Sequence, residues 1–296
     1  MAKKQKPRHP LADARMTPDL AWYDRITIDS SAGKDSQVQL DVVVSLADAM
    51  GVSRDKLVVV HCDLGEIEWE GTLDLARRQA AHYGLRFEVV RRPQGDLLEH
   101  VEQKGLWPGF ATRYCTSDHK TAQVYTLFTR LVNEMGGTNR GIWDPKEGWR
   151  PARILDCLGL RAQESDKRAE RPQLEFNARA SNGKRHVDTW LPIKWWSLEQ
   201  VWERIHATGV PYHYAYDLGM PRLSCVFCIY APEAALALAG YHNRPKLAKY
   251  ARVEAKIGHK FTIGKDGALI SLVQIQAKLE AGHIPGRVTE WNDCAA

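Results

Sequence analysis

Residues 25–40 read RITIDSSAGKDSQVQL and decide the fold. An apolar-alternating run that contains Ile26 and Ile28 ends in a cluster of small residues, and a helical pattern begins at Asp35. This order predicts a strand, a glycine-containing loop and a helix N-terminus. Such a turn presents backbone N–H groups and the positive end of a helix dipole to an anion. The expected ligand-binding residues are Ser30, Ser31, Gly33, Lys34, Asp35 and Ser36.

The side chains of this loop suit a phosphate group. Its serines supply hydroxyl donors, Lys34 supplies a mobile positive charge, and Gly33 lets the backbone approach the ligand closely. The spacing is not G-x-x-x-x-G-K-[ST], so the loop is not a Walker A loop. An accidental Ser/Gly turn before a helix is the alternative that these residues alone leave open.

The stretch Ser30–Ser36 resembles S-G-G-K-D-S, the pyrophosphate-binding loop of the N-type ATP pyrophosphatases and of the phosphoadenylyl-sulfate reductase superfamily. Ala32 stands where the commonest form has glycine. The resemblance implies that the loop binds the part of ATP that leaves, with ATP and Mg²⁺ as cofactors. It also implies catalytic roles for Lys34 and Asp35.

The composition is that of an ordinary soluble globular protein, with 26% charged and 44% hydrophobic residues among 296. No apolar run of about 18 residues is present, so we expect no transmembrane helix. The basic N-terminus lacks an apolar segment typical of secretory signals, which predicts a cytoplasmic protein with a poorly ordered tail over residues 1–20. The net charge of +5 is compatible with an anionic substrate or nucleic acid.

Alternating strand and helix patterns follow the loop. The expected strands cover residues 22–29, 56–63, 86–90, 153–158 and 186–193. This alternation predicts an α/β fold with a parallel sheet of about five strands and helices on both faces. We expect a nucleotide-binding domain over 21–230 and a mostly helical extension over 231–296. Two polar, Gly-containing stretches, 136–149 and 173–185, are predicted to be an insertion loop and a mobile excursion.

Two shorter elements lie after expected strands. Asp63 and Gly65 resemble the D-T-G that follows the second strand of the superfamily, which implies a ribose or metal contact for Asp63. A turn-capping aspartate is the alternative. The stretch 113–120, RYCTSDHK, resembles the R-x-C-x-x-x-K element at a helix start. Its spacing from Cys115 to Lys120 is one residue longer than in the family, so the role of Lys120 stays open.

The stretch 159–168, GLRAQESDKR, resembles the G-x-R-x-x-E-S-x-x-R element that follows the fourth strand. The resemblance implies that Arg161 points into the ligand cleft as a catalytic residue. It implies that Glu164 orients Arg161 or holds a metal, and that Ser165 and Arg168 bind the anionic group. From the residues alone, a surface helix start is the alternative.

The stretch 209–230 resembles a superfamily segment that ends in C-x-x-C, here Cys225 and Cys228. This spacing brings two thiolates within reach of one metal or one disulfide. Cys115 aligns with a cluster-binding position of the iron–sulfur members, and Tyr114 replaces the other cysteine found there. The resemblance therefore implies a 4Fe-4S cluster on Cys115, Cys225 and Cys228, with zinc or free thiols as alternatives. The fourth ligand would be Cys62, Cys157, a histidine or an external group.

The presence of Lys34 favours a reaction in which pyrophosphate leaves ATP, because the sulfonucleotide reductases of the superfamily commonly lack this lysine. The resemblance is then to the ATP pyrophosphatase component of DNA phosphorothioation systems. It implies adenylation of a DNA phosphate oxygen and a cysteine desulfurase persulfide as sulfur donor. A sulfate adenylyltransferase small subunit and a tRNA-thiolating enzyme belong to the same class.

Two other functions stay open. One is a reductase of adenylyl sulfate or its 3′-phosphorylated form that attacks sulfur with Cys294, although EWNDCAA lacks the glycine and histidine of the reductase tail. The other is a nucleotide-binding partner subunit without turnover.

Overall fold

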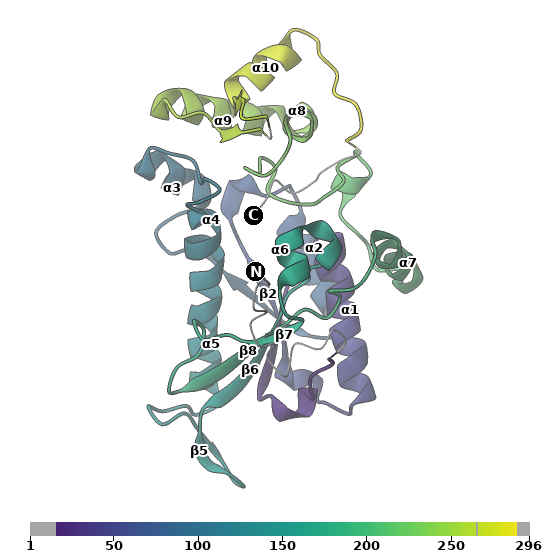
Figure 1. Ribbon diagram of the computed structural model, residues 1–296, viewed down its shortest axis with the longest axis vertical. Helices are drawn as coiled ribbons and strands as arrows, with labels where there is room; N and C mark the ends of the chain where they lie inside the picture. Colours follow the sequence, from purple (N-terminus) through teal and green to yellow (C-terminus); the bar gives the residue numbers. More distant parts are fainter. Residues whose placement is uncertain (1–15, 265, 289–296) are drawn as a thin grey trace, which may run out of the picture.

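A computed structural model describes residues 16–264 and 266–288. At its centre lies a six-stranded sheet of order β3-β2-β1-β6-β8-β7 (Figure 1). Its five parallel strands are β1 (Arg25–Asp29), β2 (Leu57–Cys62), β3 (Arg86–Val90), β6 (Ala152–Cys157) and β8 (Arg185–Trp190). These are the five strands that the sequence predicts. The α/β class with a mostly parallel sheet is therefore confirmed.

The sixth strand corrects the expected strand number. β7 (Leu174–Phe176) pairs antiparallel with β8 at the sheet edge. It lies in the stretch 173–185, which the sequence predicts to be a mobile excursion. Three residues with only one buried apolar side chain, Leu174, give too short a pattern for a sequence-based assignment.

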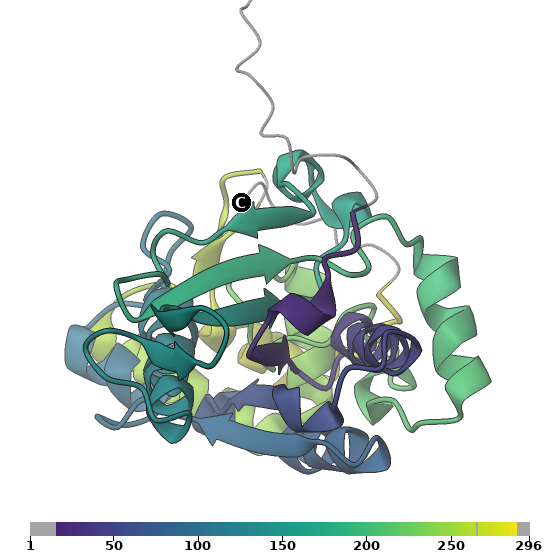
Figure 2. The same cartoon turned by 90° about the horizontal axis from the view of Figure 1, so that it is seen from below.

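The sheet is covered on both faces. Helices α1 (Lys34–Ala49) and α2 (Thr72–His82) pack against Ile26, Ile28 and Val59 on one face. Helix α5 (Ala122–Glu134) covers the other face through apolar side chains that include Phe128 and Leu131. Helix α7 (Leu198–Thr208) packs outside α1 (Figure 2). Because helices cover both faces of the sheet, its parallel strands are buried on both sides.

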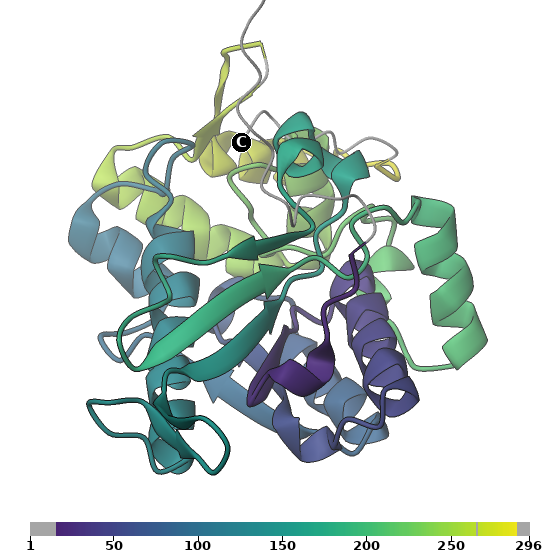
Figure 3. The same ribbon diagram turned by 60° about the horizontal axis from the view of Figure 1, so that its bottom comes forward.

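The stretch 136–149 is predicted as an insertion loop, and most of it forms a short antiparallel hairpin. β4 (Ile142–Asp144) pairs with β5 (Gly148–Arg150) through the cross-strand pair Trp143 and Trp149. The hairpin projects from the end of the molecule opposite the C-terminal helices (Figures 1 and 3).

The C-terminal part contains α8 (Glu233–His242), α9 (Arg244–Ile257) and α10 (Leu272–Glu280), with the short pair β9 (Thr262–Ile263) and β10 (Leu269–Ile270). Apolar side chains of these helices share one core with Leu64, Trp69 and the loop residue Ala32. The C-terminal part is thus packed against the carboxyl ends of the strands. The expected basic tail falls largely on residues 1–15, which lie outside the described residues.

Short elements complete the fold: η1 (Leu20–Trp22), η2 (Arg54–Lys56), η3 (Gly65–Ile67), α3 (Leu97–Lys104), α4 (Tyr114–Thr116), the π-helical turn η4 (Ser117–Thr121), η5 (Ala162–Glu164), α6 (Asp166–Glu170) and η6 (Tyr214–Tyr216). No helix within residues 16–264 and 266–288 combines the length and apolar character needed to cross a bilayer.

The strand order places a ligand crevice. The chain runs from β1 outward through β2 and β3, and then crosses to β6 on the other side of β1. Open α/β sheets bind ligands at the carboxyl ends of the strands where this reversal occurs. Here it lies between β1 and β6, directly beside the loop Ser30–Ser36.

Candidate functional site

A cavity of about 750 Å³ opens at this reversal point. Residues from every stretch singled out in the sequence line it, apart from the pair Asp63 and Gly65. The predicted site residues among them are Ser30, Ser31, Gly33, Asp35, Ser36, Cys115, Glu164, Ser165, Arg168, Cys225 and Cys228. The fold therefore brings most of the predicted residues to one place.

Hydrogen bonds of its own serines fix the shape of the loop Ser30–Ser36. The Ser31 N–H donates to Ser36 Oγ at 3.2 Å, and the Ser36 hydroxyl donates to the Gly33 carbonyl at 3.0 Å. Gly33 is the N-cap of α1. Ala32 has φ +55°, a left-handed conformation that costs an L-residue about 1–2 kcal/mol. This conformation explains why glycine suits the position better.

Lys34 and Arg161 do not point into the cavity as the sequence predicts. The Lys34 ammonium lies 3.0 Å from Asp35 Oδ2, and the Arg161 Nε lies 2.6 Å from Asp35 Oδ1. Both cations are about 95% buried, and neither lines the cavity. In this conformation Arg161 contacts Asp35 and is not among the cavity-lining residues, because the Asp35 carboxylate attracts both cations.

The charge state of Asp35 follows from this arrangement. Burial alone would raise the pKa of the Asp35 carboxyl, but the charges and hydrogen bonds of Lys34 and Arg161 outweigh it and hold the pKa below the usual value. Asp35 is thus a carboxylate that neutralises two cations beside an anion-binding loop.

The predicted anion-binding residues of the stretch 159–168 contact one another and line the cavity. Glu164 Oε2 accepts from the Arg161 N–H at 2.9 Å and pairs with the Arg168 guanidinium. Ser165 is the N-cap of α6, with its hydroxyl accepting from the Arg168 N–H at 3.4 Å. Glu164, Ser165 and Arg168 all line the cavity. Glu164 contacts Arg161 through the backbone N–H and not through the guanidinium that it was predicted to orient.

Asp63 and Gly65 do not line the cavity. Asp63 Oδ1 accepts from the Gly65 N–H at 2.8 Å, which is the turn-capping alternative. Gly65 has φ +77°, and an added Cβ would come within 2.6 Å of Asp96 Cβ. The residue types at these two positions are therefore explained by the turn and by the close approach of α3.

Four cysteines, Cys62, Cys115, Cys225 and Cys228, line the cavity together with Lys120. Cys115 comes from α4, while Cys225 and Cys228 follow η6, and all three line the space near Lys120. Burial would lower the pKa of Lys120, but the neighbouring thiols and Glu68 outweigh it and raise the pKa, so the ammonium stays charged. Burial raises the pKa of the Cys225 and Cys228 thiols. Lys120, whose role the sequence left open, thus lies in the cavity beside the thiols.

The cysteines of the cavity are the candidate metal ligands. Among the described residues, no group of three or more His, Cys, Asp or Glu side chains is arranged to hold one metal ion. Cys62, one of the expected alternatives for the fourth ligand, lines the cavity with Cys115, Cys225 and Cys228, so these four thiols are the side chains that would hold a 4Fe-4S cluster. Cys157 is buried in the core on the other face of the sheet, against Trp190, and is not that ligand.

Sequence reasoning missed two carboxylates at the reversal point. Asp29 ends β1 and Asp156 lies near the end of β6, and both line the cavity. Burial and the charge of Asp156 raise the pKa of Asp29. Asp29 Oδ1 is buried and has no hydrogen-bond partner among the described residues. This orphaned oxygen beside a phosphate-binding loop fits a nucleotide-borne Mg²⁺, which takes one or two protein carboxylates. The signal was available: a strand-terminal Asp directly before the loop.

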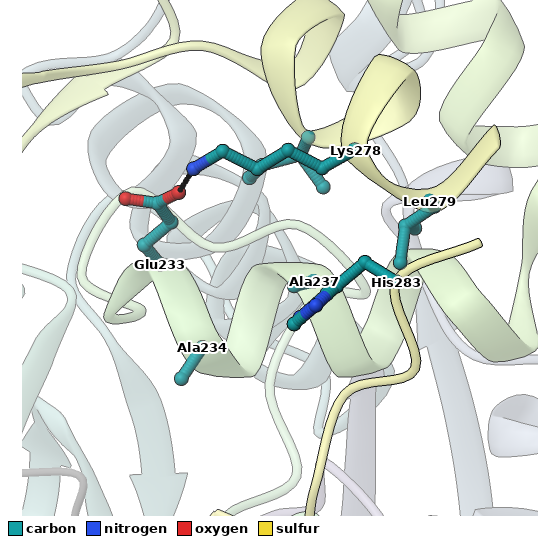
Figure 4. Close-up of a pocket in the computed structure, with 7 residues that line it drawn as sticks. Glu233, Ala234, Ala237, Lys278, Leu279 and His283 are labelled. Carbon is teal, nitrogen blue, oxygen red and sulfur yellow. Dashed lines mark hydrogen bonds and ion pairs between the residues drawn. The ribbon is translucent and has the colours of Figure 1, made fainter. Parts of the chain in front are cut away.

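A second cavity, of about 490 Å³, lies between α8 and α10 (Figure 4). Its walls are mostly apolar, and its ion pair joins Lys278 Nζ to Glu233 Oε1 at 2.6 Å. It contains no cysteine and no residue of the loop, so we assign it no chemistry. Cys294, the candidate reductase nucleophile, lies outside the described residues.

Comparison with known proteins supports the resemblance to the phosphoadenylyl-sulfate reductase superfamily. Residues 150–231 match the family model of the phosphoadenosine phosphosulfate reductase domain. Adenosine 5′-phosphosulfate reductase from Allochromatium vinosum is 26% identical over 69% of this chain and 68% of its own length. The same enzyme from Neisseria meningitidis serogroup A is 26% identical over 73% and 71%. The resemblance to the phosphoadenylyl-sulfate reductase superfamily is thus confirmed, with the family model matching over residues 150–231, whereas the particular likeness to phosphorothioation proteins is not confirmed.

Two solved structures have lower similarity. A phosphoadenylyl-sulfate reductase from Candida auris aligns with a TM-score of 0.43 and 17% identity, over 70% of this chain and 84% of its own. A tRNA thiolase from Methanococcus maripaludis, solved with its 4Fe-4S cluster, aligns with a TM-score of 0.41 and 12% identity, over 95% and 81%.

Proposed function

We propose that this protein cleaves ATP between the α and β phosphates and adenylates an acceptor for sulfur transfer. The observation that carries the proposal is the loop Ser30–Ser36 at the sheet reversal, which contains Lys34 and shares its cavity with four cysteines. A departing pyrophosphate needs backbone N–H donors and positive charge, and this loop supplies both.

The proposed reaction is an in-line displacement. An acceptor oxygen attacks the α-phosphorus, the bond from that phosphorus to the bridging oxygen breaks, and pyrophosphate leaves with the electron pair. No protein nucleophile is needed, because catalysis rests on positioning and charge stabilisation. For this step Lys34 and Arg161 must exchange their contacts with Asp35 for the phosphates. The terminal sulfur of a persulfide donor then attacks the activated atom of the acceptor and AMP leaves, and a thiol reductant cleaves the remaining S–S bond to release the thiolated product.

Bound groups would be held by residues already in place. Asp29 would hold Mg²⁺, which neutralises phosphate charge, and the four cavity cysteines would hold a 4Fe-4S cluster, which supplies a site for sulfur or electrons. Lys120 keeps its positive charge beside the thiols and so favours their ionised form. The acceptor we propose is a DNA phosphate oxygen, with a cysteine desulfurase persulfide as sulfur donor.

A reductase of adenylyl sulfate is the second candidate, favoured by the names of the relatives that match over two thirds of their length. In that reaction a Cys294 thiolate would attack the sulfur of adenylyl sulfate and release AMP. An external thiol would then release sulfite from the resulting S-sulfocysteine.

One preparation distinguishes the two candidates. The protein is purified anaerobically, its iron, sulfide and zinc contents are measured, and it is assayed for pyrophosphate release from ATP and for sulfite release from adenylyl sulfate. We expect iron and sulfide together with pyrophosphate release, and Lys34→Ala should abolish that release. If Lys34→Ala retained full activity, the assignment of Ser30–Ser36 as the pyrophosphate-binding loop would be wrong. Sulfite release that Cys294→Ser abolishes would establish the reductase instead.

A further inference from the structure

Tyr216 lies against the phosphate loop although it is 182 positions away along the chain. It ends η6, is only 6% exposed and has the ring of Trp202 edge-on at 5.1 Å between centroids. Its hydroxyl lies over Gly33, where an added Cβ would come 3.4 Å from the Tyr216 oxygen. The packing therefore fixes this hydroxyl at the mouth of the loop.

The hydroxyl oxygen is occupied as an acceptor. The Lys34 backbone N–H donates to it at 2.9 Å, and the Leu223 backbone N–H is a second donor toward it. A phenolic hydroxyl has one proton besides its acceptor positions. None of the hydrogen bonds among the described residues uses that proton. Tyr216 lines the cavity, so the proton is available to a ligand there.

The electrostatic surroundings keep this donor protonated. Burial raises the pKa of Tyr216, and the Asp35 charge acts in the same direction. The Lys34 ammonium lies over the Tyr216 ring, 5.7 Å from its centroid. At neutral pH the hydroxyl is therefore a neutral donor, which is suited to an oxyanion.

We infer that the Tyr216 hydroxyl is an additional oxyanion-binding group, which donates its proton to a phosphate oxygen held by the loop Ser30–Ser36. In the reaction proposed above, on which the identity of the ligand rests, that oxygen belongs to the departing pyrophosphate. The two backbone N–H groups aim the hydroxyl, and the ligand completes its hydrogen bonding.

The test measures binding of inorganic pyrophosphate to the full chain by isothermal titration calorimetry. Tyr216→Phe keeps the ring and removes the hydroxyl, and we expect affinity to fall about 10- to 100-fold, because hydrogen bonds to charged groups are strong. Tyr214→Phe is the matched control, since Tyr214 lies in the same short helix, is 44% exposed and should leave affinity unchanged.

A second variant separates donation from a purely structural role. Replacement of Tyr216 by 3,5-difluorotyrosine makes the hydroxyl a stronger donor and a weaker acceptor. Donation to the ligand predicts a several-fold gain in pyrophosphate affinity, whereas a role limited to accepting from Lys34 predicts a loss. Tighter binding by Tyr216→Phe would show that the hydroxyl blocks the loop, and it too would overturn the inference.

The outcome is separable from that of the proposed function. A wild-type protein that binds no pyrophosphate overturns both. If pyrophosphate binds and Tyr216→Phe weakens it, but ATP is not cleaved, the proposed function fails and the hydroxyl remains an oxyanion-binding group. If ATP is cleaved and Tyr216→Phe binds pyrophosphate normally, the inference alone fails.

Discussion

Lys34 Nζ lies 3.0 Å from Asp35 Oδ2, so the cation of the phosphate loop is ion-paired with the next residue in the chain. Arg161 occupies the other oxygen of the same carboxylate. Asp35 therefore competes with any bound anion for two cations. Because both cations are buried, the competition takes place where charges interact strongly.

Asp35→Asn is expected to destabilise the free protein and to increase its response to pyrophosphate. Removal of one partner leaves two buried cations without their counter-ion, at a cost of about 3 kcal/mol in the free energy of unfolding. The variant should have a lower Tm, and pyrophosphate should raise that Tm by more than in the wild type. Thermal unfolding with and without pyrophosphate measures both effects.

Asp48→Asn is the control, because Asp48 lies in the same helix and pairs with Arg54 at the surface. Its loss should cost under about 1 kcal/mol. If pyrophosphate protected Asp35→Asn less than the wild type, Asp35 would be needed for anion binding and would not compete with it.

Substitution of the cavity cysteines Cys115, Cys225 and Cys228 should remove iron. Each of Cys115→Ser, Cys225→Ser and Cys228→Ser should lose at least half of the iron and sulfide of the anaerobic wild-type protein, because a 4Fe-4S cluster is held by cysteine thiolates. Iron analysis and visible absorption measure the outcome. Cys157→Ala is the control, because the Cys157 thiol is fully buried on the other face of the sheet. This variant should retain the iron content of the wild type. Equal iron loss in all four variants would point to general instability.

Asp29→Asn should weaken the Mg²⁺ response of ATP cleavage while stabilising the free protein. The carboxyl lies near Asp156, and removal of one acid relieves this unfavourable pair by about 1–2 kcal/mol. A lost carboxylate ligand should raise the Mg²⁺ concentration for half-maximal pyrophosphate release about tenfold. A rise in Tm with an unchanged Mg²⁺ dependence would exclude Asp29 as a ligand.

His213 should make the protein less stable in acid. Burial lowers the pKa of His213 to about 4, whereas an unfolded histidine titrates near 6.5. Between these values the unfolded chain binds more protons, so this contribution is complete above about pH 6.5 and is lost as pH falls toward 4. His213→Asn keeps an acceptor for the Ala215 N–H and does not titrate.

The measurement is the free energy of unfolding from pH 7 to pH 4 for both proteins. The fall should be smaller in His213→Asn by about 1–2 kcal/mol, since solvent screens part of the charge. Parallel curves for the two proteins would assign the acid sensitivity to other groups, among them His119, whose pKa burial also lowers to about 4.

Local patterns predicted the elements that are long and periodic. β2 is a nearly continuous apolar run, β1 and β6 contain shorter apolar patterns, and their order alone implies a parallel sheet with a site at its carboxyl edge. The three-residue strand β7 and the hairpin β4–β5 were missed, because their partners are chosen by contact with neighbouring strands and not by periodicity.

The sequence by itself determined the phosphate loop: Ser30–Ser36 contains its own donors, its charge and the start of its helix, all within seven consecutive residues. Only the tertiary structure decided which way the charges point. Lys34 and Arg161 turn to Asp35, Tyr216 turns its hydroxyl to the loop, and Asp29 faces Asp156. Apart from the Lys34–Asp35 pair, these contacts join residues separated by more than a hundred positions, and a buried charge takes the partner that the fold brings within reach, which no local pattern records.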